Sequence, residues 1–177
     1  MTPPIIRAST EADLAAIAVI YGHHVRHGLA SFEFEPPPVA ELGRRRGEVR
    51  GLGLPHLVAE ADGRVLGFAY AGLYRARPGY AHTVEDSVYV AADAVGRGIG
   101  RALLSAVIDT CIAAGRRQMV AVIGDSANVA SIALHRGLGF QHAGTLPSVG
   151  WKHGRWVDSV LMQRALGDGD GTPAPSR

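Results

Sequence analysis

The chain has 177 residues, of which 47% are hydrophobic and 19% are charged, and its formal net charge is +2. This composition is typical of a globular protein and gives no reason to expect a nucleic-acid or membrane partner, since there is no strong basic excess and no apolar run of about 20 residues. The one cysteine, Cys111, excludes an internal disulfide and a zinc site built from cysteines.

The two ends of the chain differ from the rest. The first residues lack the basic and apolar regions of a secretory signal, so we expect a cytoplasmic protein. Residues 167–177 have little apolar content, and such a segment cannot bury a core. We therefore expect one domain over residues 1–166 and a flexible tail over residues 167–177.

The N-terminal half predicts a strand, a helix, a linker and a second helix before a β-hairpin. Apolar residues recur at helical spacing from Leu14 to Val25, and Gly28 is placed to end that helix. Three prolines make residues 29–38 a loop, because proline does not fit inside a regular element. The strand is expected at 5–8, the second helix at 39–50, and the hairpin at 56–61 and 64–74 around an Asp62–Gly63 turn.

The C-terminal half alternates strands with helices. A β-branched and aromatic run at 83–90 predicts a buried strand that leads into a glycine-dense loop at 96–101. Apolar residues from Leu104 to Ile112 then follow helical spacing, with Gly115 placed as the C-cap. Further strands are expected at 118–123, 141–146 and 156–163, and a helix at 128–138. The order predicts an α/β (or α+β) fold: a mixed, mostly antiparallel sheet with helices on both faces and one parallel crossover at the glycine loop.

The loop at 96–101 lies between a strand and a helix, an arrangement typical of a phosphate site. Glycine lets the backbone approach a ligand closely, and the first N–H groups of a helix lack partners and favour an anion. A P-loop is excluded because no Gly-Lys-Ser/Thr follows. A dinucleotide site is weaker, since Arg101 stands where the third glycine belongs, although Asp125 follows the next strand. A glycine turn without a ligand is the other alternative.

Two motifs resemble the GNAT superfamily of acetyltransferases. Gly98-Ile99-Gly100 is similar to the family's pyrophosphate loop, Gln/Arg-x-x-Gly-x-Gly/Ala, with Val95 in place of the first Gln or Arg. The block at 128–140 is similar to Asn-x-x-Ala-x-x-Leu-Tyr-x-x-x-Gly-Phe, with Ser131 and His135 at the alanine and tyrosine positions. The two motifs are separated by the proper strand, which makes the pair far more specific than either motif alone.

Further stretches resemble one branch, the phosphinothricin and methionine sulfone/sulfoximine N-acetyltransferases. They lie at 30–33, 74–80, 83–90, 120–123, 134–135 and 152–156. The resemblance implies acetyl-CoA as cosubstrate, transfer to the α-amine of a small amino acid or an analogue such as phosphinothricin, and a homodimer. An N-acetyltransferase for a polyamine or a protein N-terminus and a non-catalytic acyl-CoA sensor are the alternatives.

Two residues are candidates for proton transfer. Glu85 is the candidate base, because an α-ammonium must lose a proton before it attacks, and the branch resemblance also implies a catalytic glutamate here. Period-2 alternation puts Ser87 and Tyr89 on the face of Glu85 and Asp86 on the other, unless a bulge intervenes. His135 is a candidate acid for the departing thiolate; packing against the cofactor without proton transfer is the alternative.

The resemblance also implies a set of cofactor-binding residues. The strand edge is expected to hydrogen-bond the pantetheine arm as an added strand would, and the glycine loop to hold the pyrophosphate. These residues are Val88, Tyr89 and Val90 on the strand, Gly96, Arg97, Gly98, Ile99, Gly100 and Arg101 in the loop, and Asn128 at the cysteamine end.

Substrate choice is expected to depend on two arginines near aromatic residues. Arg75 and Arg77 can bind a carboxylate or phosphinate by paired hydrogen bonds, with a surface role as the alternative for either. The expected pocket walls are Phe32, Tyr74 and Tyr80, and Ser87 is a candidate substrate contact.

Three features are interpreted as structural. His23 and His27 have a metal-like i, i+4 spacing but no evident third ligand, so we expect no metal site. Cys111 lies on an apolar helical stripe and is expected in the core. The arginines at 44–46 are interpreted as a solvated helix face.

Overall fold

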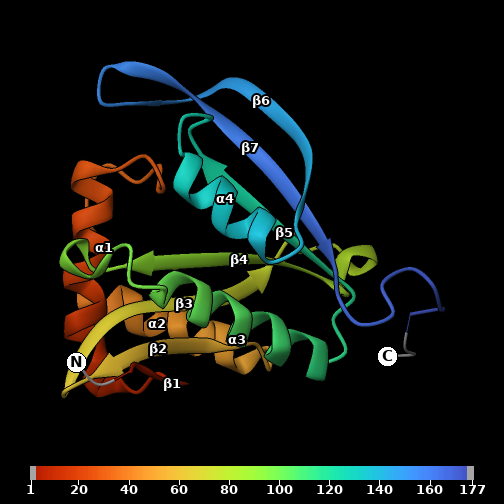
Figure 1. Cartoon of the computed structure of the whole chain (residues 1–177), viewed down its shortest axis with the longest axis horizontal. Helices are drawn as coiled ribbons and strands as arrows, with labels where there is room; N and C mark the ends of the chain where they lie inside the picture. Colours follow the sequence, from red (N-terminus) through yellow and green to blue (C-terminus); the bar gives the residue numbers. More distant parts are fainter. Residues whose placement is uncertain (1–2, 175–177) are drawn as a thin grey trace.

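The centre of the protein is one seven-stranded sheet in the order β1-β2-β3-β4-β5-β7-β6 (Figure 1). The structure, a computed structural model, describes residues 3–174. All strand pairs are antiparallel except β4 with β5. The strands are β1 Ile5–Ala8, β2 His56–Ala61, β3 Arg64–Leu73, β4 Thr83–Val90, β5 Gln118–Gly124, β6 Gln141–Lys152 and β7 Arg155–Ala165.

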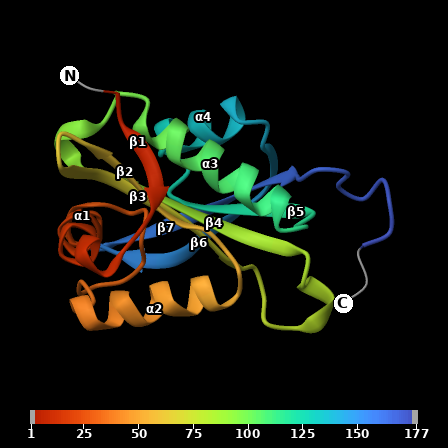
Figure 2. The same cartoon turned by 90° about the horizontal axis from the view of Figure 1, so that it is seen from below.

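Four α-helices cover the two faces of this sheet. Helices α3 and α4 lie on one face, and α1 and α2 on the other (Figure 2). Their bounds are α1 Leu14–His27, α2 Val39–Gly51, α3 Ile99–Ala113 and α4 Val129–Gly137. None of the described helices combines the length and apolar character needed to cross a bilayer.

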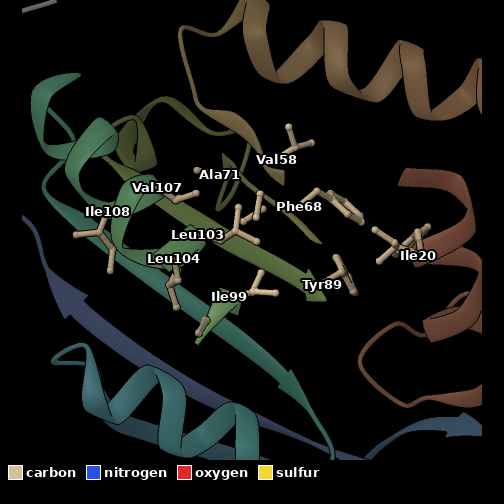
Figure 3. Close-up of a cluster of buried hydrophobic side chains, with 14 of the residues drawn as sticks. Ile20, Val58, Phe68, Ala71, Tyr89, Ile99, Leu103, Leu104, Val107 and Ile108 are labelled. Atoms are coloured by element: carbon tan, nitrogen blue, oxygen red, sulfur yellow. The ribbon is translucent and has the colours of Figure 1, made fainter. Parts of the chain in front are cut away.

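The core consists of two apolar layers, one on each side of the sheet (Figure 3). On one side, α3 buries the stripe that includes Leu103 and Val107. On the other side, Tyr21 of α1 packs edge-on against Phe68 and Tyr89, at centroid distances of 6.3 and 5.0 Å. Each fully buried side chain of this size contributes roughly 1.5–3 kcal/mol through the hydrophobic effect, so α1 and α3 are anchored firmly to the central strands.

Strands β4 and β5 separate part-way along their length, and this separation positions the site. Their parallel pairing runs only from Thr83↔Gln118 to Asp86↔Ala121. Beyond that point β4 remains paired with β3, while β5 remains paired with β7. The sheet therefore opens between residues 87–90 and 122–124, directly after Asp86.

The predicted fold class is confirmed, and most predicted elements begin and end within one or two residues of the observed ones. The Asp62–Gly63 turn has the expected positive φ angles, 51° and 73°. A single parallel strand pair excludes the dinucleotide-binding alternative, because that fold requires a mostly parallel sheet. The register of β3 with β4 is unbroken from Gly67↔Val90 to Leu73↔Val84, so the predicted face alternation of β4 holds.

Two expectations differ from the structure. Strand β6 continues to Lys152 instead of ending near residue 146, because a register shift between Leu146 and Gly150 accommodates Pro147 without ending the ladder. The arginine triplet is not uniformly solvated. Arg46 is only 7% exposed and donates from Nε to Ser9 Oγ at 2.7 Å.

The flexible tail at 167–177 stays a prediction. Residues 175–177 lie outside the described residues. Within the described part, Arg117 contacts Asp168 at 3.2 Å and donates to the Thr172 carbonyl oxygen at 3.2 Å.

Candidate active site

A cavity of about 190 Å³ lies where β4 and β5 separate. It brings together residues from the 29–32 segment, β4, the end of β5 and helix α4. Seven of the predicted site residues line it, namely Phe32, Glu85, Ser87, Val88, Tyr89, Asn128 and His135. The cavity is thus bounded by candidate catalytic, cofactor-binding and substrate-binding groups together.

Glu85 is half-buried on the α1 and α2 face of β4, at the mouth of the separation. Burial, which disfavours the charged form, raises the pKa of its carboxyl above the usual value. The neighbouring Asp86 charge raises this pKa further, and the Arg75 guanidinium opposes the shift. A carboxylate with a raised pKa is a stronger base once it is ionised.

His135 lies on the opposite side of β4 and is bound at both ring nitrogens. Its Nδ1 is 2.7 Å from the Ser131 carbonyl oxygen, and its Nε2 is 3.0 Å from Asp86 Oδ2. Burial lowers the pKa of the ring, but the Asp86 hydrogen bond and charge outweigh it, so the net shift is upward. Successive side chains of β4 point to opposite faces of the sheet. The Asp86 side chain therefore reaches α4, while the Glu85 side chain lies on the α1 and α2 face.

The edge of β4 beyond Asp86 faces the opening, and no described strand pairs with it there. Val88 and Tyr89 line the cavity. The Val90 carbonyl oxygen lies 2.8 Å from His24 Nε2 and accepts a hydrogen bond from that ring. This bond ties the end of β4 to α1.

The glycine loop leads directly into α3. Gly96 and Gly98 have φ angles of 80° and 77°, which glycine adopts without strain. Gly98 is the N-cap residue and α3 begins at Ile99. The first N–H groups of the helix consequently have no intrahelical partners, and the exposed Arg101 belongs to the first turn of the helix. The loop does not line the cavity.

Asn128 begins α4 on the other side of the opening. Its side-chain oxygen accepts a hydrogen bond from the Ser131 N–H at 3.1 Å, which caps the helix. This bond fixes the side chain at the cavity wall and leaves the amide NH₂ as its donor group.

The 29–32 segment forms one wall of the cavity and is held from three directions. A Cβ atom at Gly124 would lie 1.9 Å from the Leu29 carbonyl oxygen, so only glycine permits this approach. Tyr21 Oη and Ser31 Oγ are 3.0 Å apart. Lys152 of β6, which is 1% exposed, donates from Nζ to the Ser31 carbonyl oxygen.

The sequence profile of the Acetyltransferase (GNAT) family matches residues 22–140. The chain belongs to the GNAT acetyltransferase family. It is 53% identical over 167 residues to a phosphinothricin N-acetyltransferase from Alcaligenes faecalis, covering 94% of this chain and 85% of that protein. It is 42% identical over 161 residues to an L-methionine sulfoximine/L-methionine sulfone acetyltransferase from Salmonella typhimurium, covering 91% and 94%.

A solved structure gives the same assignment. The crystal structure of a GNAT superfamily phosphinothricin acetyltransferase from Sinorhizobium meliloti in complex with AcCoA has a TM-score of 0.95 and 44% identity. The match covers 99% of this chain and 95% of that chain. GNAT membership confirms the expected acyltransferase activity and acetyl-CoA as its cosubstrate; the roles of individual residues stay predictions.

One predicted part of the GNAT site lies outside the cavity. The residues Tyr74, Arg75, Arg77 and Tyr80 line a separate, open hollow at the β3–β4 connection. The Tyr74 and Tyr80 rings meet edge-on at 5.7 Å, and the Arg75 guanidinium lies 5.1 Å from the Tyr74 ring centre. Arg75 lowers the pKa of Glu85 and opposes the upward shift, so it is close enough to influence this carboxyl electrostatically.

Sequence reasoning missed several residues that shape the GNAT cavity. Asp86 and Lys152 make their contacts with residues 49 and 121 positions away. Hydrophobic periodicity is a local signal and cannot predict such distant pairs. Gly124 carries a signal, a glycine at the end of an apolar strand, but its meaning depends on where the 29–32 segment runs. Across residues 3–174, no three His, Cys, Asp or Glu side chains are grouped to hold a metal ion.

Proposed function

We propose that this protein transfers the acetyl group of acetyl-CoA to the α-amine of a small amino acid or analogue of the phosphinothricin, methionine sulfone or methionine sulfoximine type. The observation that carries the proposal is the placement of Glu85, a carboxylate with a raised pKa, at a cavity between separated strands. The names of the relatives supply the acceptor class.

The residues around the opening fit acetyl-CoA. The main-chain N–H groups at 98–101 offer donors to a diphosphate at the positive end of α3, and the exposed Arg97 and Arg101 add positive charge. Main-chain groups of Val88 and Tyr89 offer partners to the pantetheine amides, as an added strand would. The Asn128 amide offers a donor near the thioester.

Glu85 takes the proton that the acceptor's ammonium must lose, directly or through a water molecule. Bound acetyl-CoA supplies a thioester, whose C–S bond breaks as the amine nitrogen bonds to the carbonyl carbon. The electron pair of that bond stays on sulfur, and His135 donates a proton there. The nitrogen gives up two protons in all, one before it attacks and one after it bonds to the carbonyl carbon; His135 gives one proton to sulfur, and on balance one proton is released to solvent.

We place the acceptor end at Phe32 and Ser87 in the cavity and at Arg75 and Arg77, which line the separate hollow at the β3–β4 connection. Guanidinium groups pair with carboxylate or phosphinate oxygens in two-pronged hydrogen bonds. Two cations in that hollow favour an anionic acceptor and oppose a polyamine, which is positively charged at neutral pH. The Arg75 guanidinium lies over the Tyr74 ring, which in turn packs edge-on against Tyr80.

The protein is also proposed to form a homodimer. The β6–β7 hairpin extends from the body of the protein (Figure 1), and its large apolar side chains include exposed ones. These are Leu146, Val149, Trp151 and Trp156, which are 48% to 61% exposed. Strand β6 is an edge strand with an unpaired side, which a second copy would cover. A cytoplasmic location stays a prediction.

A panel of acceptors tests this function. The purified protein is incubated with acetyl-CoA and one amine at a time, and free thiol release is followed. We expect release with phosphinothricin, methionine sulfone or methionine sulfoximine, and at most slow release with spermidine or an N-terminal alanine peptide. Release with the polyamine or the peptide and none with the amino-acid analogues would contradict the proposed acceptor class.

A further inference from the structure

The hydrogen-bond partners of His135 indicate which of its ring nitrogens carry a hydrogen. The Ser131 carbonyl oxygen can only accept, so Nδ1, 2.7 Å away, carries a hydrogen. An ionised Asp86 carboxylate can also only accept, so Nε2, 3.0 Å from Oδ2, carries a second hydrogen. This geometry fits an imidazolium ring bound to a carboxylate at one end and to a main-chain carbonyl at the other.

The pair is enclosed. The side chains of His135 and Asp86 are 3% and 2% exposed, and Phe140 packs edge-on against the imidazole at 5.0 Å. Cys111 of α3 lies near Asp86, and its thiol is neutral because burial raises its pKa to about 12. Among the described residues, Asp86 is therefore the charged group that acts on the ring.

Asp86 also has a particular position in the sheet. It is the last β4 residue that pairs with β5 before the strands separate, and both Asp86 and His135 line the cavity. Its second carboxylate oxygen, Oδ1, is buried without a hydrogen-bond partner among the described residues. Burying a carboxylate with one oxygen that lacks a hydrogen-bond donor is costly unless a cation lies beside it. A protonated His135 ring supplies that cation.

We infer that Asp86 is a positioning residue, whose carboxylate holds the His135 Nε2–H, orients the ring at the point where β4 and β5 separate, and keeps the ring doubly protonated. The inference rests on the proposed function, in which His135 donates a proton to the departing sulfur. A buried histidine without such a partner is neutral near pH 7 and has no proton for the thiolate. With Asp86, the proton is stored at the cavity wall before the C–S bond breaks.

The same charge acts on the base. Asp86 raises the pKa of Glu85 from the other face of the strand and raises that of His135 directly. Removing the charge lowers both pKa values. Because Glu85 must be ionised and His135 protonated for turnover, both limbs of the pH–rate profile then move to lower pH.

The test is a nitrogen NMR titration of the free enzyme without either substrate, with ¹⁵N-labelled histidine rings. The chain has 8 histidines, and the His135 signals are those missing from His135→Gln. In the unsubstituted protein we expect both ring nitrogens to be protonated at pH 7. In Asp86→Asn, which keeps an acceptor oxygen but no charge, we expect His135 to be neutral at pH 7. Asp109→Asn, an exposed aspartate on α3, is the charge-matched control and should leave the His135 signals unchanged.

A neutral His135 ring in the unsubstituted protein at pH 7 would overturn the inference, and this result requires no variant to fold. An unchanged His135 protonation in a folded Asp86→Asn would also overturn it. In kinetics, Asp86→Asn should lower kcat about 100-fold, the lower end of what a positioned acid contributes, with the KM for acetyl-CoA unchanged and the pH–rate profile moved down. Acetyl transfer with a neutral ring overturns this inference alone, whereas a protonated ring without acetyl transfer overturns the proposed function alone.

Discussion

The Glu85 carboxylate combines two conditions that a general base requires. It is buried enough for its pKa to rise above the ordinary value, and it remains at the cavity mouth where an amine can reach it. The Arg75 guanidinium opposes this rise in the pKa. Glu85 thus lines the cavity and is also within electrostatic reach of Arg75, a candidate acceptor-binding residue.

Replacing Glu85 by glutamine should lower kcat/KM for the amine by about 100- to 10,000-fold, the range of a positioned acid or base. Acetyl-CoA affinity, measured by calorimetry, should stay within about twofold, because the amide keeps the shape of the side chain. Glu11→Gln, at an exposed glutamate, is the matched control. Unchanged turnover in Glu85→Gln would remove this residue from the role of base.

The pH dependence of the unsubstituted enzyme gives a separate check at Glu85. The carboxylate is active only when ionised, so kcat/KM should fall as the pH decreases through its raised pKa. The midpoint should therefore lie above 4.5, the usual value for a glutamate. In Glu85→Gln this acidic limb should be absent. An acidic limb that persists unchanged in the variant would assign it to another group.

At the scale of elements, the 29–32 segment is a wall that several parts of the chain hold in place. Leu29 lies on Gly124 of β5, Phe32 lies on Gly150 of β6, and Lys152 holds the Ser31 carbonyl oxygen. The acceptor side of the cavity is therefore shaped by a loop whose position depends on the β6–β7 hairpin. Loosening this wall should affect the amine more than acetyl-CoA.

Gly124→Ala tests this wall. The added Cβ cannot fit 1.9 Å from the Leu29 carbonyl oxygen, so the segment must move, at a cost of about 1–3 kcal/mol in the free energy of unfolding. The KM for the amine should rise, while acetyl-CoA affinity changes little. Gly47→Ala in α2 meets nothing within 4 Å and should stabilise the protein by about 0.5–1 kcal/mol. Equal unfolding free energies for the two variants would contradict this packing.

Hydrophobic periodicity and turn chemistry predict the elements of this chain well, because both signals are local. The helix stripe from Leu104 to Ile112 and the Asp62–Gly63 turn are examples. The length of β6 was not predictable, because Pro147 and Gly150 are residues that usually end a strand. In the structure a register shift between Leu146 and Gly150 lets the pairing with β7 continue past them. Glu85 and His135 follow from motif and alternation, whereas the partners Asp86–His135 and Lys152–Ser31 depend on how distant segments fold together.

At the scale of the whole molecule, the β6–β7 hairpin leaves several large apolar side chains exposed. Trp151 and Trp156 are 51% and 61% exposed and pack against each other edge-on at 5.2 Å. Exposed aromatic side chains on an edge hairpin are typical of an interface. The same hairpin carries Lys152 and Gly150, which contact the 29–32 segment. An interface there would therefore stabilise the position of that segment at the cavity.

Sedimentation tests the homodimer. The unsubstituted protein should sediment at twice the 18.6 kDa chain mass, and Trp156→Glu should convert it to a monomer, because a charge cannot be buried in an apolar interface without a partner. Val19→Glu, at a valine that is 74% exposed on α1, introduces the same charge elsewhere and should remain a dimer. A monomeric unsubstituted protein at micromolar concentration would contradict the proposed assembly.

The most direct test of the whole account is a crystal structure with acetyl-CoA. We predict that the diphosphate accepts hydrogen bonds from main-chain N–H groups at 98–101. The pantetheine should lie along the open edge of β4, and the thioester should enter the cavity between Glu85 and His135. Acetyl-CoA ordered at any other surface, with this cavity left to solvent, would contradict the account.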